Sequence, residues 1–214
     1  YKRQAEDNTS GVVSTFNNNN RWFGYITLPI AAILVILPAE SIALIWGESY
    51  TAGAWALAIL ILGRTFFYLA NTSTFLLYMY GATRLILAVN LFSALLNVVL
   101  NWILIPRMGI TGAALATATA LFAQAMLIIL SAHLYHREPG LRVFFPRILA
   151  AAVLPAAVLP ALKSVPELGW IQFIGMGLVY TTLYFLLLKS FRAFSEEDRA
   201  IGRQILSRIK GKAE

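Results

Sequence analysis

Arg64 is the residue of this sequence whose chemistry is hardest to reconcile with its surroundings, because it lies well inside the apolar run of residues 52–80. Successive helical residues are rotated by about 100°, so four more side chains lie on the same helical face as Arg64: Tyr68, Asn71, Phe75 and Tyr78. A guanidinium can bind phosphate through two parallel hydrogen bonds, and tyrosines can stack on sugars while donating hydrogen bonds. The stripe therefore predicts a site for an anionic, sugar-bearing substrate. The alternative is an arginine held by a carboxylate or by carbonyls of another helix for packing alone.

Other polar side chains also interrupt the apolar runs. Asn90, Asn97 and Asn101 share one helical face, and Gln124 is the strong hydrogen-bonding group of the next run. Amide hydrogen bonds between membrane helices explain the three asparagines better than substrate contact does. Asn97 and Gln124 are nevertheless kept as candidate cavity-facing residues. Glu40 could bind a proton or cation beside Pro38, although exposure near the membrane surface is the simpler interpretation.

The elements that must position these residues are predicted from composition. With 59% hydrophobic and 13% charged residues in 214, the chain holds more apolar surface than one soluble core can bury. A bilayer core of roughly 30 Å needs about 20 apolar residues per helix. The sequence therefore predicts an all-α membrane protein with six transmembrane helices, whose ranges are 23–46, 52–80, 85–105, 110–133, 144–162 and 169–188. Kinks are expected near Pro38 and Pro155.

Positive charge orients these spans. Of the 17 Lys and Arg residues, Arg107 and Lys163 would lie outside and Arg64 within a span, while all the others would lie at the opposite, cytoplasmic side. Residues 1–22 are interpreted as a polar cytoplasmic connector, residues 23–190 as the transmembrane lobe and residues 191–214 as a basic cytoplasmic tail. The tail is either an amphipathic helix on the anionic leaflet or a loosely ordered basic segment. The chain has no initiator Met, and we expect it to be part of a longer polypeptide.

The sequence lacks the motifs of several classes of enzyme. The sequence has no phosphate-binding glycine loop, no serine-hydrolase elbow and no metalloprotease motif. With no cysteine and no third ligand near His133 and His136, no metal or other cofactor is expected. The net charge of +7 would suggest nucleic acid in a soluble protein, but here it follows from membrane topology. We therefore expect no enzyme and no nucleic-acid partner.

Two segments resemble a known family. Residues 96–132 read LNVVLNWILIPRMGITGAALATATALFAQAMLIILSA, and residues 45–60 read IWGESYTAGAWALAIL. Both are similar to the polysaccharide exporters of the multidrug/oligosaccharidyl-lipid/polysaccharide flippase superfamily. In that family an Asn-bearing helix ends in a Pro-x-x-Gly-Ile-x-Gly-Ala-Ala turn, which here runs from Pro106 to Ala114. Gly53 stands where the second motif more often has Ala.

The resemblance implies the C-terminal lobe of a two-lobe inner-membrane transporter with 12 to 14 helices, whose N-terminal lobe lies outside this chain. Its substrate would be a polyprenyl-pyrophosphate-linked oligosaccharide, as in O-antigen, lipopolysaccharide or exopolysaccharide biosynthesis, and its other partner is membrane lipid. A cation-coupled multidrug antiporter of the same superfamily is the first alternative, but it requires carboxylates within the membrane. A polysaccharide polymerase or glycosyltransferase is less favoured, because such enzymes carry a long polar outer loop.

Overall fold

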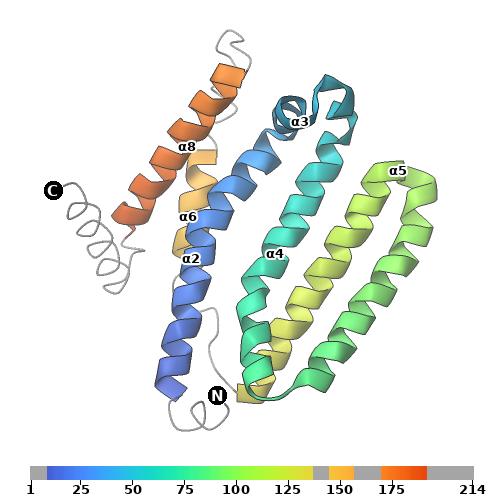
Figure 1. The fold of residues 1–214 in the computed structure, drawn as a ribbon, viewed down its shortest axis with the longest axis vertical. Helices are drawn as coiled ribbons and strands as arrows, with labels where there is room; N and C mark the ends of the chain where they lie inside the picture. Colours follow the sequence, from blue (N-terminus) through green and yellow to red (C-terminus); the bar gives the residue numbers. More distant parts are fainter. Residues whose placement is uncertain (1–8, 137–144, 157–169, 192–214) are drawn as a thin grey trace, which may run out of the picture.

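The computed structural model describes residues 9–136, 145–156 and 170–191, and within these ranges it contains helices and no strand (Figure 1). In chain order the elements are α2 (Thr9–Ile36), α3 (Pro38–Trp46), the 3-10 helix η1 (Glu48–Gly53), α4 (Ala54–Met79), α5 (Thr83–His136), α6 (Phe145–Ala156) and α8 (Trp170–Ser190). The predicted all-α class is confirmed.

The described part of the chain does not settle the predicted number of transmembrane helices. Three helical segments there are long and apolar enough to cross a membrane, and a fourth is added if the bent pair α2 and α3 is one span. Six spans are therefore not confirmed. The predicted span 144–162 is represented by the 12 residues of α6, and residues 157–169 lie outside the described ranges.

The longest helix, α5, folds back on itself at Gly109, where φ is 55° and ψ is −131°. Figure 1 shows its two limbs side by side. They contain the predicted spans 85–105 and 110–133, but the helix continues through Pro106 instead of ending there. A positive φ favours glycine, and a side chain at Gly112 would collide with the carbonyl of Leu104. The Pro-x-x-Gly-x-x-Gly motif thus forms a tight turn between two helical limbs.

The first predicted span, 23–46, is two helices rather than one. The helix axis bends by 95° between residues 24–36 and 38–46, at the predicted position beside Pro38. Leu37 has φ −119° and ψ 53°, as expected for a residue whose helical conformation is hindered by the proline that follows. The Ser41 hydroxyl donates a hydrogen bond of 2.6 Å to the Leu37 carbonyl and so satisfies it at the break. The kink predicted near Pro155 is not tested, because the described part of α6 ends one residue later.

The described residues of the predicted polar connector are helical. α2 begins at Thr9 and continues without interruption through Asn17–Asn20 into the apolar residues. The location of this segment outside the membrane stays a prediction. The predicted basic tail lies outside the described residues except for Phe191.

Two tyrosines join α8 to its neighbours. The Tyr184 hydroxyl donates to the Gly24 carbonyl of α2 at 3.1 Å, and the Tyr180 hydroxyl donates to the Ala152 carbonyl of α6 at 2.9 Å. Both tyrosines are almost completely buried, and their rings stack with centroids 6.4 Å apart. These two hydrogen bonds tie the buried side of α8 to both of its neighbouring helices.

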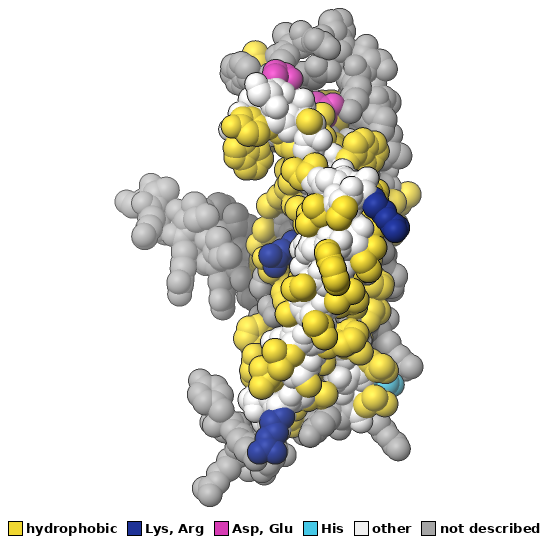
Figure 2. Space-filling view, turned by 90° about the vertical axis from the view of Figure 1, so that its right-hand side faces the viewer, with side chains coloured by type: hydrophobic (Ala, Val, Ile, Leu, Met, Phe, Trp, Pro, Cys, Tyr) yellow, Lys and Arg dark blue, Asp and Glu magenta, His cyan; other side chains and the backbone are white. Residues whose placement is uncertain are grey.

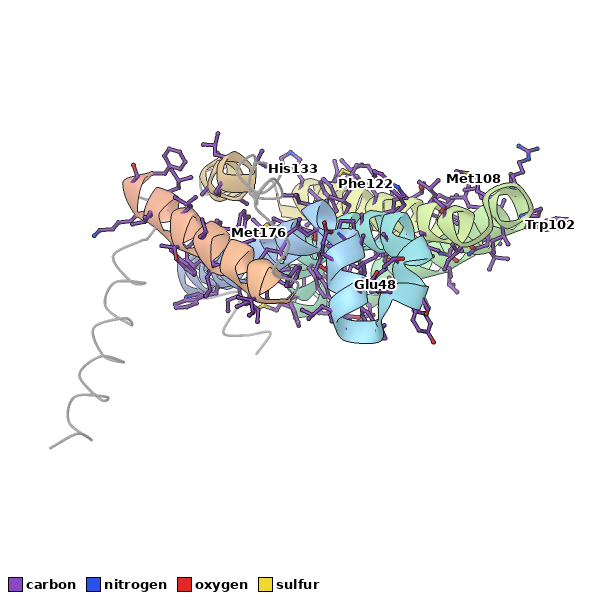
Figure 3. The ribbon with its side chains drawn as sticks, turned by 90° about the horizontal axis from the view of Figure 1, so that it is seen from above. Glu48, Trp102, Met108, Phe122, His133 and Met176 are labelled. Atoms are coloured by element: carbon purple, nitrogen blue, oxygen red, sulfur yellow. The ribbon has the colours of Figure 1, made fainter. Side chains whose placement is uncertain are left out.

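The closest helix crossing joins α4 to the second limb of α5. A Cβ added at Gly63 would lie 2.6 Å from the Cα of Ala118, so no side chain fits between the two backbones. Small residues at such a crossing allow dispersion contacts between backbones, a common way for helices to associate in lipid. Seen from above, the helices form a flattened arrangement with α5 at one edge (Figure 3).

This crossing predicts that Gly63→Ala destabilises the protein while Gly175→Ala does not. The new methyl group at position 63 must push α4 away from α5, and overpacking of this kind costs about 1–3 kcal/mol. Gly175 lies in α8 with no atom within 4 Å of an added Cβ, so alanine there is tolerated. Thermal unfolding of both purified variants in the same detergent measures the difference, and equal midpoints would contradict the close crossing.

Candidate functional site

Four residues of the predicted substrate stripe are exposed on α4. Tyr68, Phe75 and Tyr78 lie within about 40° of Arg64 around the helix axis, and none of the four is covered by another described helix. Asn71 belongs to the same face by its position, but its side chain lies outside the described part of the structure. We call these five residues the arginine face of α4.

The opposite face of α4 is also exposed in the first half of the helix, and its exposed side chains are apolar. Trp55, Leu62 and Phe66 lie about 160–200° from Arg64 around the helix and are 75%, 48% and 42% exposed. Between the two exposed faces the helix is covered by α2 and by α5. α4 therefore has two uncovered sides of different chemistry, and only one of them carries a charge.

Arg64 has no ion pair and no hydrogen bond with any residue that the structure describes. The alternative was that another helix of this chain binds the guanidinium for packing alone. Residues 9–136, 145–156 and 170–191 contain no such partner. An unpaired guanidinium facing lipid near the middle of a helix costs at least about 2.5 kcal/mol. The arginine face is thus the side of α4 that requires water, a ligand or a further protein surface.

Asn97 and Gln124, the two other predicted site residues, lie between the limbs of α5. The Asn97 amide donates to the Thr117 hydroxyl at 3.2 Å and accepts from Asn101 at 2.6 Å. The Gln124 amide donates to Asn90 at 2.7 Å. This hydrogen-bond ladder confirms the interpretation of the asparagines as helix-packing groups. Such bonds average about 0.6 kcal/mol each in membranes, so together they make a moderate contribution to holding the limbs together.

Ser93 and Thr117 also belong to this ladder, and neither was predicted as a hydrogen-bonding member of it. The Ser93 hydroxyl is buried and lies 2.9 Å from the Ala120 carbonyl and 3.4 Å from the Gln124 side-chain oxygen. Ser93 lies one turn from Asn97, so its helical position could have placed it on the asparagine face. Thr117 was hidden within a run of small residues that predicts packing and nothing more specific.

A ring contact shows on which side of the molecule the ladder lies. The Phe66 and Phe122 centroids are 5.2 Å apart, so Phe122 is on the same side as the apolar face of α4. Gln124 and Thr117 lie about 200° and 140° from Phe122 around the second limb of α5, on its opposite flank. The opposite flank points to the side of Arg64. Five of the six predicted site residues therefore lie on this side, with Asn71 placed by its backbone position, and Asn97 on the first limb is linked to it through Thr117.

The two sides differ in chemistry along α5 as well. On the side of Phe122, the exposed residues of the second limb include Met126 and Leu130. On the side of Arg64, Thr117 and Gln124 are only half-exposed and are linked to the asparagines of the first limb. We refer to these as the apolar side and the polar side. Figure 2 views the α5 edge, which is largely hydrophobic, with acidic side chains near the end that carries α3.

The remaining candidates lie near the helix ends. Glu40 is half-buried in the first turn of α3, a position where a helix N-terminus favours negative charge. His133 is exposed in the last turn of α5. Within the described ranges, no three His, Cys, Asp or Glu residues are grouped so that they could hold a metal ion.

Comparison with known proteins gives no match: no family model, no curated protein and no solved structure is similar to this chain. The resemblance to polysaccharide exporters therefore stays a prediction from the residues that carry it.

The difference between the two sides can be tested with introduced thiols, because the chain has no cysteine of its own. Tyr68→Cys and Tyr78→Cys should react with a water-soluble methanethiosulfonate reagent at least about tenfold faster than Leu62→Cys and Phe66→Cys, since the reactive thiolate forms in water and not in hydrocarbon. Labelling rates in native membranes give the comparison. Equal rates at Tyr68 and Phe66, which are two residues apart, would show that the polar side has no special access to water.

Proposed function

We propose that this chain is the C-terminal lobe of a transporter that moves a polyprenyl-pyrophosphate-linked oligosaccharide across a cell's inner membrane. The observation that carries the proposal is Arg64: an exposed cation, without an intramolecular partner in the described structure, in the middle of a membrane-length helix. The family resemblance around Pro106 supplies the transporter class, and the site chemistry supplies the type of ligand.

The arginine face has the two functions that such a head group requires. Arg64 would bind the pyrophosphate through charge-assisted hydrogen bonds, which are stronger than neutral ones. Tyr68, Phe75 and Tyr78 lie between Arg64 and the end of α4 and would offer aromatic surfaces and hydroxyl donors to the sugars. The polyprenyl tail would remain in the lipid while the head group occupies the space facing the polar side.

Transport would then follow from alternating access. The head group would neutralise the cation and so lower the cost of closing the site to water, after which the two lobes would rock and open it to the other side. We propose that the lobe outside this chain forms the opposing wall. A cation or proton gradient could drive the cycle, and no described residue is assigned to that coupling.

The proposed orientation places both ends of the chain in the cytoplasm. Figure 1 shows that α2, α4 and the two limbs of α5 run in alternating directions, with α2 beginning at the end where α4 meets α5. Arg84 belongs to the first turn of α5, at the end where α2 begins, and Arg107 belongs to the turn between the limbs of α5 at the opposite end. The excess of Lys and Arg among the residues assigned to the first end makes it the cytoplasmic one.

A multidrug antiporter of the same superfamily is the second candidate. Its coupling chemistry requires carboxylates within the membrane, and in the described spans Glu40 is the acidic residue nearest to such a position. An exposed arginine flanked by tyrosines favours an anion over the cationic substrates typical of such antiporters.

The test is a flipping assay of the full-length protein reconstituted in liposomes. Arg64→Ala should reduce the rate about ten- to a hundredfold, because hydrogen bonds to charged groups contribute about 1.5–3 kcal/mol. Arg64→Lys keeps the charge but loses the bidentate geometry, so its rate should be intermediate. Arg84→Ala, which removes an exposed cation from the first turn of α5, is the matched control and should transport normally. Normal transport by both Arg64 variants would refute the assignment.

A further inference from the structure

The last turn of α3 is an uncovered apolar tip. Leu44, Ile45 and Trp46 are consecutive and are 45%, 60% and 59% exposed. Consecutive residues of a helix point in directions about 100° apart, so the tip is open on most of its circumference. Three large apolar side chains at the end of one short helix would be costly in water.

The base of α3 is held firmly, so the tip has a defined position. Ile42 is buried, and Ser41 is 1% exposed with its hydroxyl bonded to the Leu37 carbonyl at the bend. At the other end, two backbone carbonyls of α3 accept hydrogen bonds from the Gly47 N–H. The helix is therefore anchored at its first turn and projects from there.

The direction of α3 follows from the bend of 95° after α2. α2 runs alongside the long helices α4 and α5 (Figure 1), so α3 runs across their axes. If the long helices cross the membrane, α3 must lie nearly parallel to its plane. α3 also lies at the end of the molecule, beside η1, rather than at the middle of the long helices.

Two further aromatic residues are exposed in the elements that follow α3 at this end. Tyr50 in η1 is 65% exposed, and Trp55 in the first turn of α4 is 75% exposed. Tyr and Trp combine an apolar ring with a hydrogen-bonding group and concentrate at the boundary between lipid headgroups and acyl chains. Glu48 is exposed in the same turn, as a charged group at the aqueous edge of that boundary would be.

We propose that the tip of α3, together with Tyr50 and Trp55, is a membrane-interface anchor that inserts into the headgroup–acyl boundary of the leaflet at this end. The partner is the phospholipid surface itself. The anchor would fix the depth of the α2–α3 bend in the bilayer and would hold α3 parallel to the membrane. The proposal rests on the membrane location of the helices and not on the identity of the transported substrate.

Spin labelling tests the depth of the tip directly. A nitroxide at Ile45→Cys in the full-length protein, reconstituted in phospholipid liposomes, should collide with oxygen more than a label at Glu48→Cys and with a water-soluble nickel chelate more than a label at Leu95→Cys. Leu95 is 64% exposed near the middle of the first limb of α5 and serves as the deep control. A label at Ile45 that matches Glu48 would place the tip in water, and one shielded from both collision partners would show that protein covers it. Either result overturns the proposal.

Fluorescence of the native Trp46 gives a second measurement of depth, without any substitution in the tip. With Trp22, Trp55, Trp102 and Trp170 replaced by Phe, Trp46 fluorescence should be quenched most by phospholipids brominated near the headgroup and less by those brominated near the chain end. No quenching by either lipid would contradict insertion. Strongest quenching by the deep bromines would show that α3 is buried in the membrane core instead of lying at its surface.

Discussion

The side chains available to a ligand are set by one close crossing, that of α4 over the second limb of α5. The contact of Gly63 with Ala118 brings the two backbones together, so that α5 covers one flank of α4 while α2 covers the other. What remains of α4 is two narrow faces on opposite sides of the molecule. Arg64 and Phe66 are about 200° apart on the helix, and the crossing, by fixing the rotation of α4 about its own axis, decides to which side of the molecule each of them points.

In a membrane, the rotation of α4 determines which of its faces lies against lipid. Hydrocarbon accepts Leu62, Phe66, Phe122 and Met126 without cost, but an unpaired guanidinium faces it only at a large one. The apolar side is therefore suited to lipid, and the polar side to an aqueous space or a second lobe. The ladder between the limbs of α5 lies on the same side, so α4 and α5 both place polar side chains there. Asn97 and Gln124 stabilise the wall on which Arg64 lies, whether or not they also reach a ligand.

Much of this arrangement was predictable from the sequence, because strong local rules govern it. Apolar runs and positive charge predicted an all-α membrane protein, and helical spacing alone grouped Arg64 with Tyr68 and Tyr78. The break at Pro38 followed from the conformational restriction on Leu37. The asparagine spacing correctly predicted hydrogen bonds between helices.

Other features depended on tertiary contacts that spacing does not encode. The bend at Pro38 is 95°, and a proline alone does not predict whether a helix kinks or turns into a new direction. The polar stretch before Trp22 is helical because α2 extends past the apolar region, which composition could not show. Ser93 and Thr117 joined the ladder only when two limbs were brought together by the turn at Gly109. Six spans are not confirmed, since the described residues hold three membrane-length helices or, with the bent pair, four.

The central claim is that Arg64 faces an aqueous, ligand-accessible space while Phe66 faces lipid. A cryo-electron microscopy map of the full-length protein in lipid nanodiscs tests it most directly, because ordered acyl chains and protein surfaces can be distinguished at the two sides. We predict acyl-chain density against Leu62, Phe66 and Met126, and a solvent-filled space bounded by a second helical lobe in front of Arg64. Acyl chains packed against Arg64 and Tyr68 would contradict the assignment.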